Sequence, residues 1–230
     1  EMTLTTKQYF AAISGLDKQF GRIIDYLKEN DLYDDTIVIL SADHGDMMGS
    51  HGLMGKHVWY EESIRIPFVV HIPGNENRRC STCIGSQDMM PTILGLLNCP
   101  IPDTVEGEDC QRFIKGEEDE ERVSFICASP GRADFVEKFK KAGKNPASYG
   151  WRGVRTKRYT FVLELGYDVI CKPKRYLYDI LKDPEQKNLL DLEDEENKEL
   201  AKKLEADVMD WMKRQNDSFL DNWIKEADNE

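Results

Sequence analysis

The stretch TIVILSADHGDMMGSHGLMGKH, residues 36–57, decides both the fold and the site. Its first five residues, 36–40, are continuously apolar and rich in β-branched side chains, a pattern typical of a central strand buried on both faces. Charged or ligating side chains follow it: Asp43, His44, Asp46, His51, Lys56 and His57. In open α/β sheets, ligands bind beyond the carboxyl ends of the strands, where loops carry the chemistry. The stretch therefore predicts a buried strand that ends in a binding site.

A helix is expected before this strand. Between residues 6 and 29, apolar side chains recur at three- and four-residue steps and form one face: Tyr9, Phe10, Ile13, Leu16, Phe20, Ile23, Ile24 and Leu27. Thr5 and Gln8 fit a capping box at the start of the helix. A helix, a short turn and a buried strand make one half of a βαβ unit, so this part of the chain is interpreted as α/β.

The character of the sequence changes further along the chain. A strand is expected at 68–72 and a helix at 86–97. Later strands are expected at 123–128, 151–156, 159–165 and 175–180, and one long amphipathic helix at 195–223. We therefore expect an α/β part over residues 1–122, followed over residues 123–230 by a subdomain with antiparallel strands and a terminal helix.

Composition excludes some classes of function. The 230 residues are 40% hydrophobic, which is enough for a substantial core. The net charge of −12 argues against a nucleic-acid partner, because binding to phosphates needs a basic surface. No apolar run approaches the roughly 18 residues of a membrane span. The acidic run at 117–121 is expected to be a solvated loop.

Several familiar motifs are absent from the sequence. Cys80 and Cys83 form one C-x-x-C pair, but no second pair lies at zinc-site spacing, so ordinary loop thiols or a local disulfide are the better interpretation. There is no H-E-x-x-H, EF-hand loop, Walker loop or G-x-S-x-G serine elbow. Asp43 and His44 combine two metal-ligand types, although an Asp after a strand also forms ordinary Asx turns. His71, inside an apolar strand, is expected to be a core histidine with a satisfied ring.

Long segments of the chain closely resemble the sulfatase family, within the alkaline-phosphatase-like superfamily. The central segment is ADHGDMMGSHGLMGKHVWYEESIRIPFVV, and it is flanked by YFAAISGLDKQFGRIIDYLKENDLYDDTIVILS and SQDMMPTILGLL. Further along, WRGVRTKRYTFV and RYLYDILKDPEQKNLLD look like the family's C-terminal subdomain. The resemblance implies part of an alkaline-phosphatase-like sandwich, a mixed sheet flanked by helices, followed by a small antiparallel sheet with a C-terminal helix. Residues 1–122 would then be the C-terminal part of the sulfatase core.

The resemblance also implies roles for individual residues. Asp43 and His44 match the family's metal ligands, which usually bind Ca²⁺, with Mg²⁺ as the alternative. Lys56 matches the lysine that contacts the sulfate group, and His51 falls on a common histidine and is a candidate for the substrate pocket. Attack at sulfur builds negative charge on the oxygens, and a divalent cation and a lysine stabilise that charge. His57 matches no functional position of the family.

The nucleophile implied by the resemblance is a formylglycine, made from cysteine or serine in a C/S-x-P-x-R motif that precedes the metal motif. Cys171-Lys172-Pro173-Lys174-Arg175 matches those letters but follows the metal motif and lacks the leucine-rich stretch and Thr-Gly of the family, so it is interpreted as a chance match. The chain therefore resembles the C-terminal half of a sulfatase. Its nucleophile would lie on a missing N-terminal segment or chain, and these residues alone are expected to be inactive.

Three functions stay open on the sequence. The first is hydrolysis of a sulfate ester on a sulfated small molecule or glycan. The second is a phosphonate monoester hydrolase or phosphodiesterase of the same superfamily. The third is a non-catalytic module that binds a partner or a sulfated glycan through a basic and aromatic cluster: Trp151, Arg152, Arg155, Lys157 and Arg158. The alternation of strand residues would divide that cluster between two faces, which favours an ordinary charged hairpin.

Overall fold

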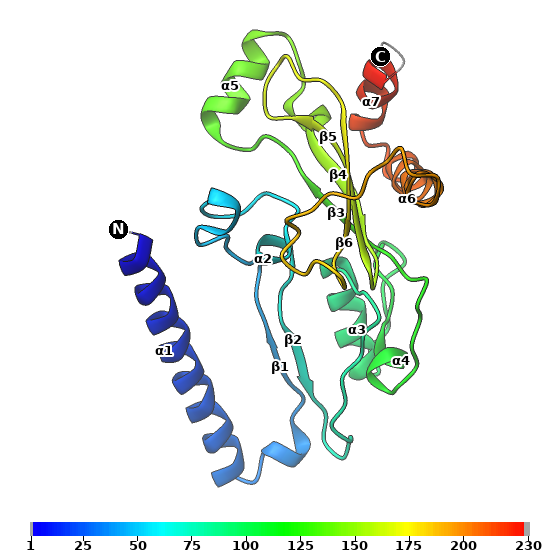
Figure 1. Cartoon of the computed structure of the whole chain (residues 1–230). Helices are drawn as coiled ribbons and strands as arrows, with labels where there is room; N and C mark the ends of the chain where they lie inside the picture. Colours follow the sequence, from blue (N-terminus) through cyan, green and yellow to red (C-terminus); the bar gives the residue numbers. More distant parts are fainter. Residues whose placement is uncertain (1, 228–230) are drawn as a thin grey trace. The chain divides into compact units, whose positions relative to one another are not determined.

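The computed structural model of the protein describes residues 2–227, and its backbone divides into two compact units, Glu1–Asn77 and Arg78–Glu230 (Figure 1). Each unit is described by itself. The expected division of the chain at residues 122 and 123 stays a prediction. No helix among the described residues is both long enough and apolar enough to cross a membrane.

The first unit contains one long helix and a two-stranded sheet. Its elements are α1 (Met2–Glu29), η1 (Tyr33–Asp35), β1 (Val38–Ser41), η2 (Ser50–Gly52), α2 (Glu61–Ile64) and β2 (Phe68–His71). The expected helix at 6–29 and the expected strands at 36–40 and 68–72 are therefore present, with shifted ends. Strands β1 and β2 pair antiparallel, in a register that places Val38 opposite His71 and Ser41 opposite Phe68.

The expected burial of the strand at 36–40 is not found in this structure. Val38 and Ile39 are half-buried, and Leu40 is 40% exposed. The reason is that, within residues 2–227, β1 pairs with β2 alone, so one of its edges and much of its surface have no covering strand or helix. Within the described residues the prediction of a central strand buried on both faces is therefore wrong, because a strand is buried on both faces only where other strands and layers surround it.

Helix α1 also exposes apolar side chains that its sequence pattern predicts to be buried. Its apolar residues share one face, as the periodicity predicted, but several of them are exposed by 37–70%: Tyr9, Phe10, Ile13, Leu16 and Ile23. We call Tyr9, Ile13, Leu16 and Ile23 the α1 stripe. A helix with an apolar face normally buries that face against another layer. The α1 stripe is therefore a surface typical of a helix in a larger fold.

The second unit is built on a four-stranded antiparallel sheet in the order β3-β4-β5-β6. The strands are β3 (Ser124–Ala128), β4 (Gly150–Arg155), β5 (Tyr159–Gly166) and β6 (Lys174–Asp179). The helices are η3 (Ser86–Asp88), α3 (Met89–Leu96), α4 (Gln111–Ile114), α5 (Ala133–Lys141), η4 (Pro146–Ser148), α6 (Glu195–Arg214) and α7 (Phe219–Ala227). The antiparallel sheet, its hairpin and the terminal helix confirm the expected fold class for this half of the chain.

The single long helix expected at 195–223 is wrong, because the chain breaks it into α6 and α7. Asp194 caps the start of α6 by accepting hydrogen bonds from the N–H groups of Glu196 and Asn197. At its end, Asn216 has a φ of 49°, and the N–H of Asp217 reaches the carbonyl of Met212 at 2.9 Å. This is a Schellman ending, in which an asparagine takes the left-handed position that stops a helix.

The core of the second unit lies between the sheet and the two C-terminal helices, which cover one face of the strands (Figure 1). Fully buried sheet residues such as Val154, Phe161 and Leu177 belong to the same apolar cluster as Val208 and Met212 of α6. Because the strands alternate their faces, these positions are the inward-facing ones. Helix α6 therefore has the amphipathic role that its sequence predicted.

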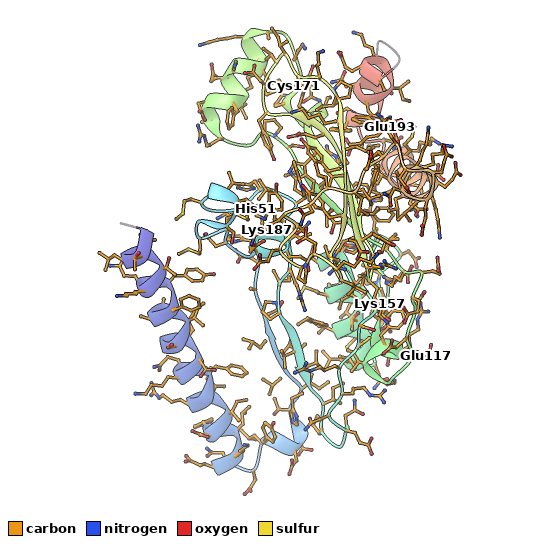
Figure 2. All side chains as sticks on the ribbon, viewed as in Figure 1. His51, Glu117, Lys157, Cys171, Lys187 and Glu193 are labelled. Carbon is orange, nitrogen blue, oxygen red and sulfur yellow. The ribbon has the colours of Figure 1, made fainter. Side chains whose placement is uncertain are left out.

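The acidic run at 117–121 forms a mostly exposed loop, as the sequence predicted, and it also makes ion pairs. Glu118 and Glu120 pair with Lys157 at the turn of the β4–β5 hairpin, and Glu121 pairs with Lys203 of α6. Figure 2 labels Lys157 and Glu117, the first residue of the run. Exposed ion pairs of this kind contribute little stability, about 0–1 kcal/mol each. They neutralise Lys157, whereas the acidic run keeps a net negative charge.

Candidate functional site

The turn that follows β1 brings a carboxylate and an imidazole together. The backbone N–H of His44 donates to Oδ1 of Asp43 at 3.0 Å, and His44 Nε2 lies 3.3 Å from Asp43 Oδ2. The other ring nitrogen, Nδ1, lies 2.7 Å from the carbonyl oxygen of Gly45. The pair of ligand-type side chains is therefore present. The bond at Asp43 is not an Asx turn, because it goes to the next N–H, and the N–H two residues on, that of Gly45, donates to Ser63 instead.

The contact to Gly45 sets the tautomer of His44. A carbonyl oxygen can only accept, so Nδ1 carries the hydrogen and donates it. In the neutral ring, Nε2 then carries a lone pair, and this lone pair faces Oδ2 of Asp43. Both atoms are acceptors, and two acceptors 3.3 Å apart need a proton or a cation between them. A ring held by a backbone carbonyl through one nitrogen is the usual arrangement of a metal-binding histidine. Asp43 and His44 therefore fit a divalent cation.

As metal ligands, these two residues would be an incomplete set. Among residues 2–227, no group of three or more His, Cys, Asp or Glu side chains is placed to hold a metal ion. The Asp43 side chain is 86% exposed and that of His44 38% exposed, so both are open to further ligands. Ca²⁺ takes six to eight oxygen ligands, and Mg²⁺ takes about six in an octahedron. The residues that the structure describes would supply only a part of either shell.

The turn is held against helix α2. The N–H of Gly45 donates to the carbonyl of Ser63 at 2.9 Å. A Cβ atom added to Gly45 would lie 1.9 Å from the carbonyl oxygen of Glu62, which is closer than any real contact. Glycine is therefore required at this position by close approach of two backbones. The approach fixes where the Asp43-His44 pair stands relative to α2.

His51 lies at the tip of the loop between β1 and α2 (Figure 2). Its backbone has a φ of 53°, in the left-handed region, and its ring stacks on Tyr60 with centroids 3.7 Å apart. The stack fixes the ring plane while leaving the residue exposed. This is compatible with a substrate-pocket residue, and no contact places His51 against the Asp43-His44 pair.

Lys56 lies on the same loop, directly after Gly55. Its side chain is exposed and makes no hydrogen bond or ion pair with any other residue that the structure describes. An unpaired, exposed ammonium group is available to bind an anion. Lys56, His51, Asp43 and His44 lie in one segment of the first unit, and their roles in a site stay predictions.

The two histidines outside this group are structural in different ways. The ring of His71 stacks on that of Tyr33 at 4.1 Å, and Nε2 lies 3.4 Å from the carbonyl oxygen of Tyr33. The prediction that the ring of His71 has a partner is therefore confirmed, but the prediction of a core position is wrong, because His71 is only half-buried. His57 has a φ of 80°, which is strained for a side chain other than glycine, and it forms part of the loop that leads to α2.

Cys171 lies on the connection between β5 and β6 (Figure 2), and the other cysteines are also free thiols. Its Sγ donates to the carbonyl of Asp168 at 3.1 Å, and burial raises the pKa of the Cys171 thiol. A raised pKa keeps a thiol protonated and unreactive. Cys80 and Cys83 form no disulfide, so of the two interpretations of that pair, loop thiols hold.

The basic residues of the hairpin are paired within the second unit. Arg152 is buried and donates to Asp217, and Arg158 donates to Asp179 through Nε at 3.0 Å and Nη2 at 2.6 Å. Each guanidinium is therefore already neutralised. This weighs against the basic cluster as a binding surface for a sulfated glycan and favours the ordinary charged hairpin.

Comparison with known proteins gives one consistent family. A family model described as Sulfatase matches residues 4–99. An endo-4-O-sulfatase of Bacteroides thetaiotaomicron is 32% identical over 224 residues, which cover 94% of this chain and 42% of that relative. An ulvan-active sulfatase of Formosa agariphila is 33% identical over 188 residues, which cover 79% of this chain and 34% of the relative.

Solved structures agree with these relatives. A 4S-sulfatase structure from Bacteroides thetaiotaomicron, from work on glycosaminoglycan metabolism, has a TM-score of 0.77 at 31% identity and covers 96% of this chain and 45% of that one. A phosphonate monoester hydrolase from Silicibacter pomeroyi has a TM-score of 0.66 at 27% identity and covers 89% of this chain and 40% of that one. The chain thus spans less than half the length of these proteins.

Proposed function

The chain belongs to the sulfatase family of the alkaline-phosphatase-like superfamily, and from that premise we propose that it contributes the metal- and sulfate-binding part of a sulfuric ester hydrolase. One observation carries the proposal. Asp43 and His44 present a carboxylate oxygen and a ring nitrogen side by side, with the ring held by the Gly45 carbonyl. Lys56 follows on the same loop with no partner among the described side chains.

The residues of this chain have distinct tasks in the proposed reaction. Asp43 and His44 would hold a divalent cation, Ca²⁺ or Mg²⁺, which supplies positive charge next to the oxygens of the sulfate group. Lys56 binds the sulfate by charge and hydrogen bonding, and its stabilisation grows as negative charge builds up during attack at sulfur. His51, with its ring plane set by Tyr60, lines the substrate side of the pocket.

The proposal includes residues from outside this chain. A complete site needs further metal ligands and the nucleophile, a formylglycine in this family. This chain covers 42% of the endo-4-O-sulfatase, so a protein of that length has room for the further metal ligands and the nucleophile. We expect the 230 residues alone to hydrolyse no sulfate ester. The exposed α1 stripe and the half-covered strand β1 support this view, because both are surfaces that a larger α/β fold would bury.

A sulfated glycan is the proposed substrate class. The two relatives described above are an endo-4-O-sulfatase and an ulvan-active sulfatase. Their names describe those proteins, and they support a sulfated saccharide for this chain. A sulfated small molecule is the alternative within the same reaction.

The runner-up activity is phosphonate monoester or phosphodiester hydrolysis. The likeness to the phosphonate monoester hydrolase supports it, since a lysine and a metal-ligand pair serve a phosphoryl group as well as a sulfuryl group. A panel of sulfate esters, phosphate diesters and phosphonate monoesters separates the two activities.

The deciding experiment compares the 230-residue chain with the protein isolated from its natural source. Denaturing intact mass spectrometry on the source protein is expected to show additional residues, in one longer chain or in a second chain, with a cysteine or serine converted to an aldehyde. The source protein should hydrolyse sulfated oligosaccharides and lose that activity with a chelator. A source protein consisting of this chain alone, with no aldehyde, would overturn the proposal and bring the binding-module function to the front.

A further inference from the structure

Asp46 has no role in the proposed site, yet its side chain lies at the centre of the loop. It is half-buried, and one oxygen, Oδ1, accepts two backbone hydrogen bonds, from the N–H of Met48 at 2.9 Å and from the N–H of Gly55 at 3.3 Å. The first bond closes an Asx turn. The second spans nine residues and reaches the position directly before Lys56.

Gly55 is held from both sides. Its N–H donates to Asp46, and its carbonyl accepts from the N–H of Met47 at 2.7 Å. A further bond, from the N–H of Gly49 to the carbonyl of Leu53 at 2.8 Å, closes the tip of the loop. Gly55 has a φ of 78°, a conformation that other residues adopt only with strain. The peptide unit that precedes Lys56 is therefore fixed to the Asp46-Met47 segment.

The same segment is continuous with the metal-ligand pair. Asp46 is two residues after His44, and Gly45 between them is bonded to Ser63 of α2. One short backbone frame thus carries both the Asp43-His44 pair and Lys56. In the absence of the Asp46 oxygen, the ten-residue loop would be tied at that end by the Met47–Gly55 bond alone.

We propose that Asp46 is a positioning residue that sets where Lys56 stands relative to Asp43 and His44, an inference that rests on the proposed sulfate-binding role of Lys56. Its effect comes from the acceptor oxygen Oδ1, since both of its partners are backbone N–H groups. Asparagine keeps such an oxygen and alanine does not. The pair Asp46→Asn and Asp46→Ala therefore separates positioning from a role that needs the negative charge, such as metal binding.

The first test uses the 230-residue chain and needs no catalytic activity. Amide hydrogen exchange is measured by NMR for Met48 and Gly55 in the wild type, Asp46→Asn and Asp46→Ala. We expect the exchange of both amides to rise about tenfold or more in Asp46→Ala and to stay within about twofold in Asp46→Asn. Asp25→Ala, an exposed acid on α1, is the matched control and should change neither amide. Unchanged exchange at Gly55 in Asp46→Ala would overturn the proposal.

The second test uses the active protein from the natural source, with a sulfate ester as substrate. Asp46→Ala is expected to lower kcat/KM by about tenfold or more, because small displacements of a catalytic group are costly. Asp46→Asn should retain most of the wild-type kcat/KM. In a double-mutant cycle, adding Asp46→Ala to Lys56→Ala should lower kcat/KM by less than a further twofold or so, since Asp46 acts through Lys56.

Two outcomes of the second test contradict the inference. If Asp46→Asn is as damaging as Asp46→Ala, the charge matters and the residue binds something directly. If the Asp46→Ala and Lys56→Ala losses multiply in full, Asp46 acts independently of Lys56. A source protein that hydrolyses no ester at all would refute the proposed function, whereas the exchange experiment would still decide whether Asp46 fixes the loop.

Discussion

Arg152 and Asp217, 65 residues apart in sequence, form a bidentate ion pair inside the second unit. Nε of Arg152 lies 2.5 Å from Oδ2 of Asp217, and Nη2 lies 3.1 Å from Oδ1. The pair joins strand β4 to the break between α6 and α7. Asp217 Oδ1 also accepts the N–H of Phe219 at the start of α7. The arginine side chain is 5% exposed and the aspartate 16%, so water replaces neither partner easily.

Asp217→Ala should therefore be strongly destabilising. Removing one partner of a buried pair leaves the other charge without compensation, which typically costs about 3–5 kcal/mol. Urea unfolding of the second unit, followed by tryptophan fluorescence, measures the loss. Asp103→Ala, at an exposed loop position, is the matched control and should change the free energy of unfolding by less than about 0.5 kcal/mol. Equal effects of the two substitutions would refute this reading of the pair.

Two glycine substitutions in the first unit should have opposite signs. Gly45→Ala places a Cβ atom 1.9 Å from the Glu62 carbonyl oxygen, so the metal-ligand turn must move, at a cost of about 1–3 kcal/mol. Gly15→Ala lies in helix α1 with no atom within 4 Å and should stabilise by about 0.5–1 kcal/mol, because alanine is the better helix former. Thermal unfolding of both variants measures the two changes in stability. Stabilisation by Gly45→Ala would contradict the close approach of the two backbones.

Lys56→Ala should remove activity without unfolding the chain. In the source protein, loss of one group that stabilises the transition state typically lowers kcat by about 10²–10³. The circular dichroism spectrum should not change, since the side chain is exposed and makes no hydrogen bond or ion pair with another described residue. Lys18→Ala, on the side of α1 opposite its apolar face, provides the control. A Lys56→Ala enzyme with full activity would exclude this lysine from sulfate binding.

Stability in acid should depend on Asp179. The Arg158 guanidinium, followed by the N–H groups of Lys182 and Leu181, holds the pKa of this buried carboxyl below its usual value. The folded state then binds fewer protons than the unfolded state. The stabilisation is fully present above the unfolded pKa of about 3.9, and it is lost as the pH falls through the lower folded value.

Asp179→Asn is expected to cost about 1–3 kcal/mol at pH 7, the worth of hydrogen bonds to a charged group. Below the folded pKa the variant and the wild type should converge. Urea unfolding at a series of pH values between 7 and 2 measures the difference. A gap that stays constant over that range would show that the Asp179 carboxylate charge contributes nothing.

The α1 stripe should make the isolated chain self-associate. Exposed contiguous apolar surface promotes association in water. Replacing Ile13 and Leu16 by glutamate is expected to lower the apparent mass of the 230-residue chain at high concentration, as measured by light scattering, and to leave its helix content unchanged. The exposed positions Lys7 and Lys18, changed to glutamate, are the control. The same stripe substitutions in the source protein should be destabilising there, if a larger fold covers this face.

Much of this protein was determined by local sequence. The α1 stripe, the apolar run at 36–40 and the Asp43-His44 pair were visible as patterns, because helical period, β-branching and ligand chemistry act over a few neighbouring residues. The hairpin around Lys157 and the capped start of α6 at Asp194 are local in the same way. The family resemblance rests on the same stretches.

Other features were decided by tertiary structure. The sequence did not show that Arg152 meets Asp217, that Lys157 meets Glu120, or that Gly45 touches Glu62, because each pair joins segments that only the folded chain brings together. Asp46 was visible in the motif, but its task depends on a bond to Gly55 nine residues away. The burial of β1 is also a property of its neighbours, since a strand is central only when other layers cover it. Local patterns thus specify elements and chemistry, while long-range contacts position them, because packing and hydrogen bonding across the chain depend on geometry that no short stretch contains.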